Sequence, residues 1–143
     1  MVEELFGTTP VTSKAGPVNP KDAFKGAKLI CIYFSMHNCP PCRQFTPVFA
    51  ELYKEINESE KVIEVIFLSG DKTQEEYDEY YGEMPWLALP KGDARLPPIA
   101  KKFEVRGVPR LIILKPDGSV VEQNGVQKIL MEGPGAIEEY LSK

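Results

Sequence analysis

The chain has 143 residues, of which 43% are hydrophobic and 27% charged, and it carries a formal net charge of −4. This length fits one domain with a buried core, and the composition is typical of a folded globular protein rather than a disordered one. The acidic balance argues against a nucleic-acid-binding protein, whose charge is usually basic and clustered. No apolar run approaches the roughly 18 residues that a membrane-spanning helix needs, so we expect neither nucleic acid nor membrane among the partners.

The cysteine content and the first residues bear on the compartment. The chain has 3 cysteines, and a small odd number makes a poor disulfide framework for a secreted module. Residues 1–16 carry glutamates and no long apolar stretch, so they do not resemble a secretory signal. We therefore expect the cytoplasm, with the nucleus as an alternative. In such a reducing compartment a C-x-x-C pair indicates catalysis or metal binding.

The predicted elements begin after a loop-rich amino-terminal extension of a single domain that covers residues 1–143. Residues 8–20 are rich in Pro, Gly, Thr and Ser, which predicts a loop, so we place the extension at about residues 1–19. Asn19 followed by Pro20 is typical of a helix start and predicts a short helix to Phe24. The continuous apolar run within residues 28–35 then predicts a buried central strand.

A longer helix and a second buried strand are predicted next. Apolar side chains recur at the i, i+3, i+4 spacing of an amphipathic helix, at Phe45, Val48, Phe49, Leu52, Tyr53 and Ile56. Pro47 lies inside this helix and is expected to kink it, because proline lacks a backbone N–H. Residues 62–68 predict the second buried strand.

The carboxyl-terminal half predicts two more helices and a hairpin. Thr73 and Glu76 have capping-box spacing at the start of a helix, which ends at Gly82 and turns Tyr77, Tyr80 and Tyr81 toward the core. An apolar connector at 84–90 and a short helix at 98–103 follow. Turn residues at 115–119 join strands 111–114 and 120–121, and a helix is expected at 136–141. This order predicts an α/β fold, with a mixed sheet of parallel strands, an antiparallel hairpin edge and helices on both faces.

Residues 38–43, NCPPCR, combine a C-x-x-C pair with a strand-to-helix junction. Cys39 is expected at a helix N-terminus, where unpaired N–H groups lower the pKa of the thiol and favour the nucleophilic thiolate. Cys42 lies within the first turn and can attack a mixed disulfide formed on Cys39. Pro40 and Pro41 have no N–H to offer the Cys39 sulfur, which leaves Cys42 and Arg43 as the nearby donors.

Two other interpretations of this pair remain open. Cys39 and Cys42 could be buried, inert thiols, or they could belong to a structural zinc site. Zinc needs about four ligands, whereas the chain offers three cysteines, one histidine, His37, and no second C-x-x-C. The strand-to-helix context favours redox chemistry over both, so we expect no metal.

Four segments carry a family resemblance: YFS at 33–35, CPPCRQFTP at 39–47, YYGEMPWLALP at 80–90 and VRGVPRLIILKPDG at 105–118. Together they make residues 20–125 resemble the thioredoxin superfamily, and most closely its tryparedoxin and nucleoredoxin-like branch. The resemblance implies the thioredoxin fold, with Cys39 as nucleophile and Cys42 as resolving thiol. It also implies a cis-proline at Pro109 that faces the disulfide, although an ordinary trans turn is the alternative for an X-Pro bond. Val108 would then offer backbone groups to an extended substrate, beside Pro40 and Pro41.

The chain departs from this family pattern at several places. The family usually has Trp at the position of Asn38, and trypanosomatid tryparedoxins have Trp at the position of Gly70 as well. Those aromatic residues help to dock partners, so trypanothione is not implied as the donor. Tyr33 stands where thioredoxin has a buried Asp, so that proton transfer would need water or another group. Arg110 replaces a common Thr, which implies a different choice of substrate.

For four other features, a structural role is the simpler interpretation. We expect His37 to be a solvated loop residue, with tuning of Cys39 or action as a base as the alternatives. We expect Cys31 to be a buried, inert apolar residue, with regulatory oxidation as the alternative. Trp86 is expected in the core, with a contact surface near the redox site as the alternative. The acidic run Glu75, Glu76, Asp78 and Glu79 is expected to be a solvated face.

The sequence favours a thiol–disulfide oxidoreductase that reduces protein disulfides, such as those of peroxiredoxins, with electrons from a small thiol or a reductase. We expect it to act in cell redox homeostasis, as a monomer, with no cofactor other than the redox-active Cys39–Cys42 disulfide. The main alternative is a redox-sensitive protein-binding module with little turnover, as the nucleoredoxin-like resemblance implies. A third is an oxidase or isomerase for folding proteins, against which the absence of a secretory signal argues.

Overall fold

The longest apolar run of the chain, at residues 29–34, and the run at residues 65–68 lie in the two central strands of the sheet. In the computed structural model, which describes residues 2–143, strands β3 (Leu29–Ser35) and β4 (Ile63–Ser69) are buried along their whole length. They pair in parallel, from Leu29 opposite Ile63 to Ser35 opposite Ser69. Strands that are buried on both faces read as continuous apolar runs, which is why their positions are evident in the sequence.

The other strands extend this pair into a seven-stranded mixed sheet with the order β2-β1-β5-β4-β3-β6-β7. The pairs β3–β4 and β4–β5 are parallel, and the remaining neighbours are antiparallel. The additional strands are β1 (Val11–Ser13), β2 (Gly16–Val18), β5 (Leu87–Ala88), β6 (Arg110–Leu114) and β7 (Val120–Glu122). The predicted mixed sheet with a hairpin at its edge is therefore confirmed.

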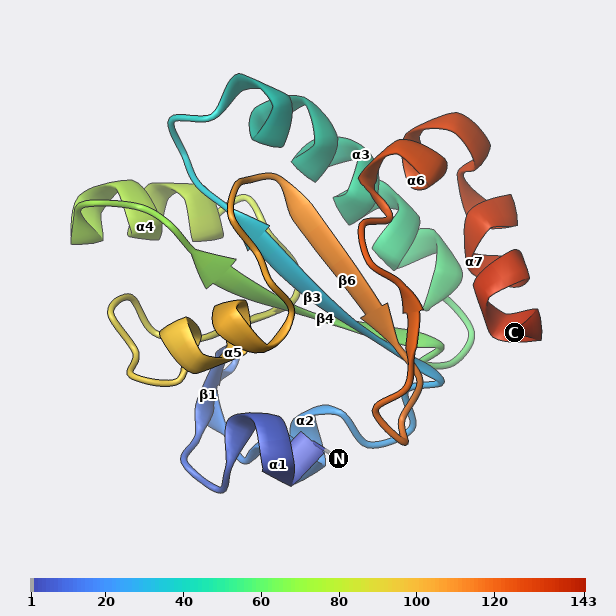
Figure 1. Ribbon diagram of the computed structural model, residues 1–143, viewed down its shortest axis with the longest axis horizontal. Coiled ribbons are helices and arrows are strands. Elements are labelled where there is room, and N and C mark those ends of the chain that lie inside the picture. Colours follow the sequence, from blue (N-terminus) through green and yellow to red (C-terminus); the bar gives the residue numbers. More distant parts are fainter. Residues whose placement is uncertain (1) are drawn as a thin grey trace.

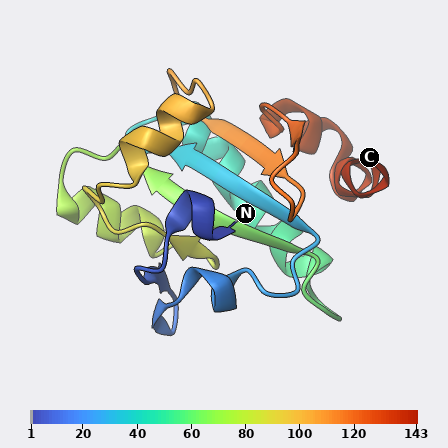
Figure 2. The ribbon, with the colours of Figure 1, turned by 60° about the horizontal axis from the view of Figure 1, so that its bottom comes forward.

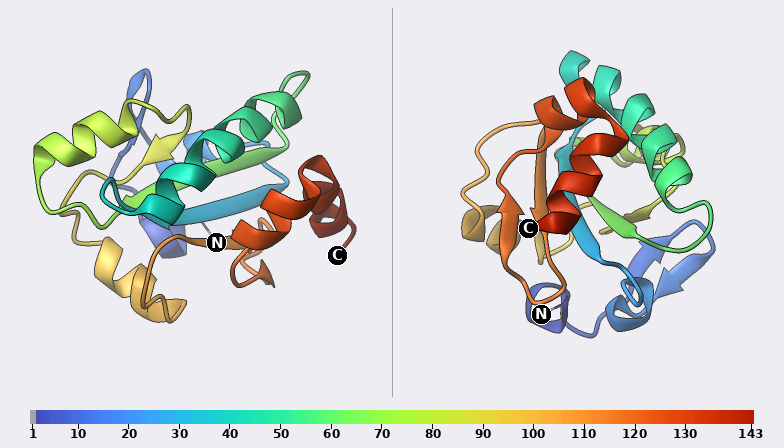
Figure 3. Two further views of the ribbon diagram at one scale, coloured as in Figure 1. Left: turned by 90° about the horizontal axis from the view of Figure 1, so that it is seen from above. Right: turned by 90° about the vertical axis from the view of Figure 1, so that its right-hand side faces the viewer.

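Helices cover both faces of this sheet (Figure 1). They are α1 (Val2–Phe6), α2 (Pro20–Ala23), α3 (Pro40–Ile56), α4 (Gln74–Tyr81), α5 (Leu96–Lys102), α6 (Val126–Glu132) and α7 (Pro134–Ser142). Side chains of α3, α4, α6 and α7 pack in one hydrophobic core, and side chains of α1, α2 and α5 pack in the other. Figure 2 shows α1, α2 and α5 in front of the sheet, and Figure 3 shows α3 lying across the opposite face.

The predicted amino-terminal loop is wrong over most of its length. Residues 8–20 contain the hairpin β1–β2, in which Val11 pairs with Val18, and Gly16, the first residue of β2, adopts a φ of 118° directly after the turn. Thr12 also pairs with Ala88 of β5. These short strands are held by pairing at the edge of the sheet and not by their own sequence preference. Their Gly- and Pro-rich sequence therefore carries no local sign of a strand. The loop-rich extension is instead a helix and a hairpin joined to the domain.

Three further differences concern single elements. The apolar connector at 84–90 contains the two-residue strand β5, and α6 was not predicted because it is short and bounded by Gly125 and Gly133. Val48 was expected on the apolar face of α3, but 45% of its surface is exposed. The other predicted helices, strands and the carboxyl-terminal hairpin form at their expected places. None of the helices within residues 2–143 is long and apolar enough to cross a bilayer.

Candidate functional site

The two cysteines of the C-x-x-C pair lie where β3 ends and α3 begins. Cys39 is the N-cap of α3 and Cys42 lies in its first turn, with 5.2 Å between their Cα atoms. Their sulfur atoms are joined in a disulfide. The predicted strand-to-helix context of the pair is confirmed.

The two prolines leave a single backbone donor for the Cys39 sulfur in the first turn. Pro40 and Pro41 occupy the first two helical positions, where a missing N–H costs nothing in helix hydrogen bonds. The next residue, Cys42, donates its N–H to the Sγ atom of Cys39 at 3.4 Å. This contact lets the sulfur take the role that a serine or aspartate oxygen has at an ordinary N-cap.

The two cysteines differ in their access to solvent. Cys42 is fully buried, whereas Cys39 retains 9% of its exposure. Cys39 also lines a shallow hollow at the surface together with His37, Asn38, Pro40 and Arg43. A partner thiol or disulfide that approaches from solvent therefore meets Cys39 first.

The Val108–Pro109 peptide bond, on the loop before β6, is cis. This is the arrangement that the family resemblance implies, and it replaces the ordinary trans turn. The carbonyl oxygen of Val108 lies 3.9 Å from the Sγ atom of Cys39. Arg110 turns away from this point, since its Nε donates to the carbonyl oxygen of Gln123 at 2.8 Å. Val108, Pro109 and the disulfide thus meet at one end of the sheet.

A cluster of buried hydroxyl groups lies directly beneath the first turn of α3. The Oγ1 atom of Thr46 donates to the carbonyl oxygen of Cys42 at 2.8 Å. The same oxygen lies 2.7 Å from the hydroxyl of Tyr33 and 2.6 Å from the hydroxyl of Tyr80. Tyr80 in turn lies 2.6 Å from the hydroxyl of Ser35. Burial raises the pKa of Tyr33, so this residue stays protonated and cannot replace a buried carboxylate as a base.

The loop before Cys39 is fixed to the start of α4. The backbone N–H of His37 donates to Asp71 at 2.6 Å, and Asn38 donates from Nδ2 to the carboxylate of Glu76. Glu76 also closes the predicted capping box with Thr73, whose side chain accepts from the Glu76 N–H at 3.1 Å. Asn38, which stands where the family usually has Trp, therefore holds the loop through a polar contact.

His37 is less solvated than the sequence predicts. Its ring packs edge-on against Tyr80, with 5.9 Å between the ring centroids, and only 19% of the side chain is exposed. Its Nε2 atom lies 3.7 Å from the Glu79 carboxylate. The sequence shows a lone histidine in a loop and gives no sign of the tyrosine against which it packs.

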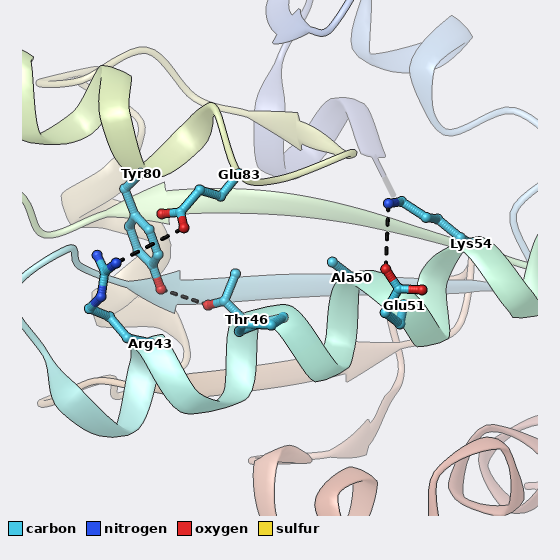
Figure 4. A pocket seen from close by; sticks show the side chains of 8 residues that line it. Arg43, Thr46, Ala50, Glu51, Lys54, Tyr80 and Glu83 are labelled. Atoms are coloured by element: carbon cyan, nitrogen blue, oxygen red, sulfur yellow. Dashed lines mark hydrogen bonds and ion pairs between the residues drawn. The ribbon is translucent and has the colours of Figure 1, made fainter.

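A groove of about 250 Å³ runs between α3 and the end of α4 (Figure 4). Thr46, Pro47, Ala50 and Tyr80 line it together with charged residues at its rim. Arg43 lies 4.0 Å from Glu83 across one end. Arg43 also borders the hollow beside Cys39, so the hollow and the groove adjoin along α3.

Two residues outside the pair, Cys31 and Trp86, lie in the core as expected. Cys31 is fully buried in β3, and its burial together with the nearby Glu64 carboxylate raises the pKa of its thiol. Trp86 is 1% exposed and packs in the core against Tyr33 and other aromatic rings. Across residues 2–143, no group of three or more His, Cys, Asp or Glu side chains is arranged to hold a metal ion.

Comparison with known proteins places these features in a family. A thioredoxin-like family model matches residues 26–120. Probable nucleoredoxin 1 of Arabidopsis thaliana is 49% identical over 109 residues, which cover 76% of this chain and 19% of the relative. Tryparedoxin of Trypanosoma brucei brucei is 35% identical over 138 residues, which cover 95% of this chain and 94% of the relative.

A solved structure of tryparedoxin II complexed with glutathionylspermidine superimposes with a TM-score of 0.82, at 31% identity, and covers 94% of both chains. The chain spans about a fifth of the length of the Arabidopsis nucleoredoxin, but nearly the whole length of the tryparedoxins. Three findings point to the same family. They are the disulfide at the start of α3, the cis-proline beside it and the family model matched over residues 26–120. This chain belongs to the thioredoxin-like family, together with the nucleoredoxins and tryparedoxins.

Proposed function

We propose that this chain is a thiol–disulfide oxidoreductase that reduces disulfides of protein substrates. In the reduced enzyme, the Cys39 thiolate attacks a substrate disulfide, forms a mixed disulfide and releases one substrate thiolate. Cys42 loses its proton to solvent and attacks the Cys39 sulfur, which releases the second substrate thiolate and leaves the Cys39–Cys42 disulfide. Two electrons pass from the enzyme to the substrate.

The difference in exposure between the two cysteines is the observation that carries this proposal. Cys39 reaches the surface hollow and Cys42 does not, so the first attack falls to Cys39. The N–H of Cys42 points at the Cys39 sulfur, and a donor of this kind stabilises a thiolate. The position at the N-terminus of the seventeen-residue helix α3 acts in the same direction.

The backbone of Val108, on the loop before β6, is the proposed docking site for an extended segment of the substrate. Its carbonyl oxygen lies near the Cys39 sulfur, and an extended segment can pair with such a free backbone group. Pro40 and Pro41 follow Cys39 in the chain and are exposed, so they offer apolar contacts without competing N–H donors. The residues on either side of the scissile disulfide would lie across this surface.

The electron donor and acceptor are further parts of the proposal. A small thiol is one candidate donor, which the tryparedoxin II complex with glutathionylspermidine supports. A reductase is the other. Peroxiredoxins are the proposed acceptors and the cytoplasm the proposed compartment. The Cys39–Cys42 pair itself carries the electrons, so the proposed cycle includes no separate cofactor and no metal.

A redox-sensitive binding module is the second candidate function. Asn38 favours it, because this residue stands where the family usually has a partner-docking Trp and is committed to a contact with Glu76. The relationship with nucleoredoxins also agrees with this candidate. In that case oxidation of Cys39 and Cys42 would change the affinity for a partner without rapid turnover.

Reduction of insulin by the purified chain, with dithiothreitol as donor, tests the first candidate. We expect turnover by the wild type and by the control variant Cys31→Ser, no turnover by Cys39→Ser, and a trapped mixed disulfide with Cys42→Ser. If the wild type is as slow as Cys39→Ser, the reductase proposal fails. Capture of the same partner by wild type and by a variant lacking both cysteines would then favour binding.

A further inference from the structure

The hydroxyl cluster beneath α3 has only one arrangement of its protons. A carbonyl oxygen can only accept, so Thr46 must spend its single proton on the carbonyl of Cys42. Tyr33 and Tyr80 must then both donate to the Thr46 oxygen. Because the proton of Tyr80 is used in this way, Ser35 must donate to Tyr80. Every hydrogen bond in the cluster therefore points toward the carbonyl group of Cys42.

This cluster joins three elements of the fold to one peptide group. Ser35 and Tyr33 come from β3, Tyr80 from α4, and Thr46 from α3 itself. All four residues are buried, with at most 3% exposure. Hydrogen bonds in such a chain polarise and strengthen one another in a low-dielectric interior. Loss of the Thr46 hydroxyl leaves the protons of Tyr33 and Tyr80 without this acceptor, which is costly for buried hydroxyl groups.

The site of attachment is a weak point of the helix. Pro47 has no N–H, so the backbone donor that the Arg43 carbonyl would have in a regular helix is missing. The turn that carries Cys42 is thus followed directly by a gap in the backbone hydrogen bonds. The contact from Thr46 reinforces the neighbouring carbonyl. The N–H of Cys42 is fixed at its other side by the Cys39 sulfur.

From this geometry we propose that Thr46 is a positioning residue for the resolving cysteine, with Tyr80 and Tyr33 holding Thr46 in place. The hydroxyl of Thr46 fixes the peptide group of Cys42, so that the Cys42 sulfur stays aligned for attack on a mixed disulfide at Cys39. The role concerns the second chemical step alone, because Cys39 lies outside the cluster. This inference rests on the proposed redox cycle, and it identifies the residues that make its second step fast.

The two steps can be separated with an equimolar amount of the aromatic disulfide dithiobis(nitrobenzoate). The Cys39 thiolate attacks this reagent and releases one coloured nitrothiobenzoate anion in a first phase. Cys42 then attacks the Cys39 sulfur, the internal disulfide forms, and the second anion is released in a second phase. The reduced protein loses two electrons and the reagent gains them. Stopped-flow absorbance gives both rates, and Cys42→Ser shows the first phase alone.

We expect Thr46→Val to slow the second phase about fivefold or more, the effect of losing a buried hydrogen bond, and to leave the first phase within about twofold. Thr46→Ser keeps the hydroxyl group and restores the second phase. Tyr80→Phe removes one of the two donors to Thr46 and gives a smaller slowing of the same phase. A purely structural role would change both phases alike or neither.

Several outcomes would overturn the inference. Equal second phases in wild type and Thr46→Val do so, as does a slowing that Thr46→Ser fails to restore. Should Thr46→Val not fold, an unchanged second phase in Tyr80→Phe has the same meaning. The proposed reductase function fails on a different result. A wild type that shows both phases but does not reduce insulin refutes the reductase function alone.

Discussion

Asn38 donates a hydrogen bond from its Nδ2 atom to the carboxylate of Glu76, so the residue next to Cys39 is fixed to the first turn of α4. Glu76 also accepts from the Thr73 hydroxyl through its other carboxylate oxygen at 3.0 Å. One carboxylate therefore caps α4 and holds the loop before the disulfide. The contact explains how the loop before the disulfide keeps its position.

A double-mutant cycle between these two residues measures this contact. We expect Asn38→Ala and Glu76→Ala each to destabilise the protein, and the double variant to be less unstable than their sum by about 0.5 kcal/mol, since the bond is exposed to solvent. Urea unfolding of the four proteins gives the coupling free energy. Gln74→Ala, in the same turn of α4, is the control. A coupling of zero would show that the contact does not hold the loop in solution.

The sequence could predict the site but not everything that positions it. Continuous apolar runs gave β3 and β4, and the C-x-x-C pair between a strand and a helix gave Cys39 and Cys42. The roles of Thr46 and Tyr80 could not be derived, because their hydrogen bonds join residues that are 34 positions apart. The helical periodicity places Tyr80 on the core side of its helix and predicts nothing more about it. Periodicity shows which face a residue occupies but not where its hydroxyl group finds a partner.

The amino-terminal segment illustrates a second limit of sequence reasoning. The hairpin β1–β2 has no alternating apolar pattern, and a distant residue secures the segment instead. The guanidinium group of Arg95 donates to the carbonyl oxygens of Phe6 and Thr9 at 2.8 and 2.7 Å, and to that of Pro10 at 3.1 Å. Arg95 lies 85 positions from Pro10 along the chain. The local sequence of the amino-terminal segment therefore gives no sign of this contact.

Substitution of Arg95 is expected to loosen this segment. Arg95→Ala removes three hydrogen bonds to backbone carbonyl groups of this segment and two to the Asp93 carboxylate, and we expect a loss of about 1 to 3 kcal/mol in the free energy of unfolding. Arg95→Lys restores little of this loss, because an ammonium group lacks the planar fork that reaches three carbonyl groups at once. Urea unfolding gives the stability, and hydrogen exchange at residues 6–12 locates the change. Full recovery by lysine would contradict the role of the fork.

The pairing of Arg95 with Asp93 also predicts a dependence on pH. Hydrogen bonds from the Arg95 side chain, above all, hold the pKa of Asp93 below its usual value. A carboxylate with a lowered pKa in the folded state stabilises the protein fully above its unfolded pKa of about 3.9, and the contribution is lost as the pH falls through the lower folded value.

We therefore expect Asp93→Asn to be less stable than the wild type at pH 6, and the difference to shrink steadily below about pH 4. Urea unfolding between pH 6 and pH 2 provides the test. Asp117→Asn provides a comparison at an exposed turn. Hydrogen bonds from Ser119 lower the pKa of Asp117 as well. A difference for Asp93→Asn that stays constant over this range would rule out its ionised form as the source of stability.

The third cysteine is expected to take no part in the chemistry of the other two. Cys31 lies in the middle of the sheet between Val65 of β4 and Ile113 of β6, with no exposed surface. Burial raises the pKa of its thiol, and thiolates are the species that react with alkylating agents.

In the reduced native protein at pH 8, iodoacetamide should therefore modify Cys39 first and leave Cys31 unmodified until the protein unfolds. Peptide mass spectrometry against time, with and without urea, measures the order. Native modification of Cys31 at a rate near that of Cys39 would mean that the sheet opens readily, and Cys31 would then have to be counted among the redox-active thiols.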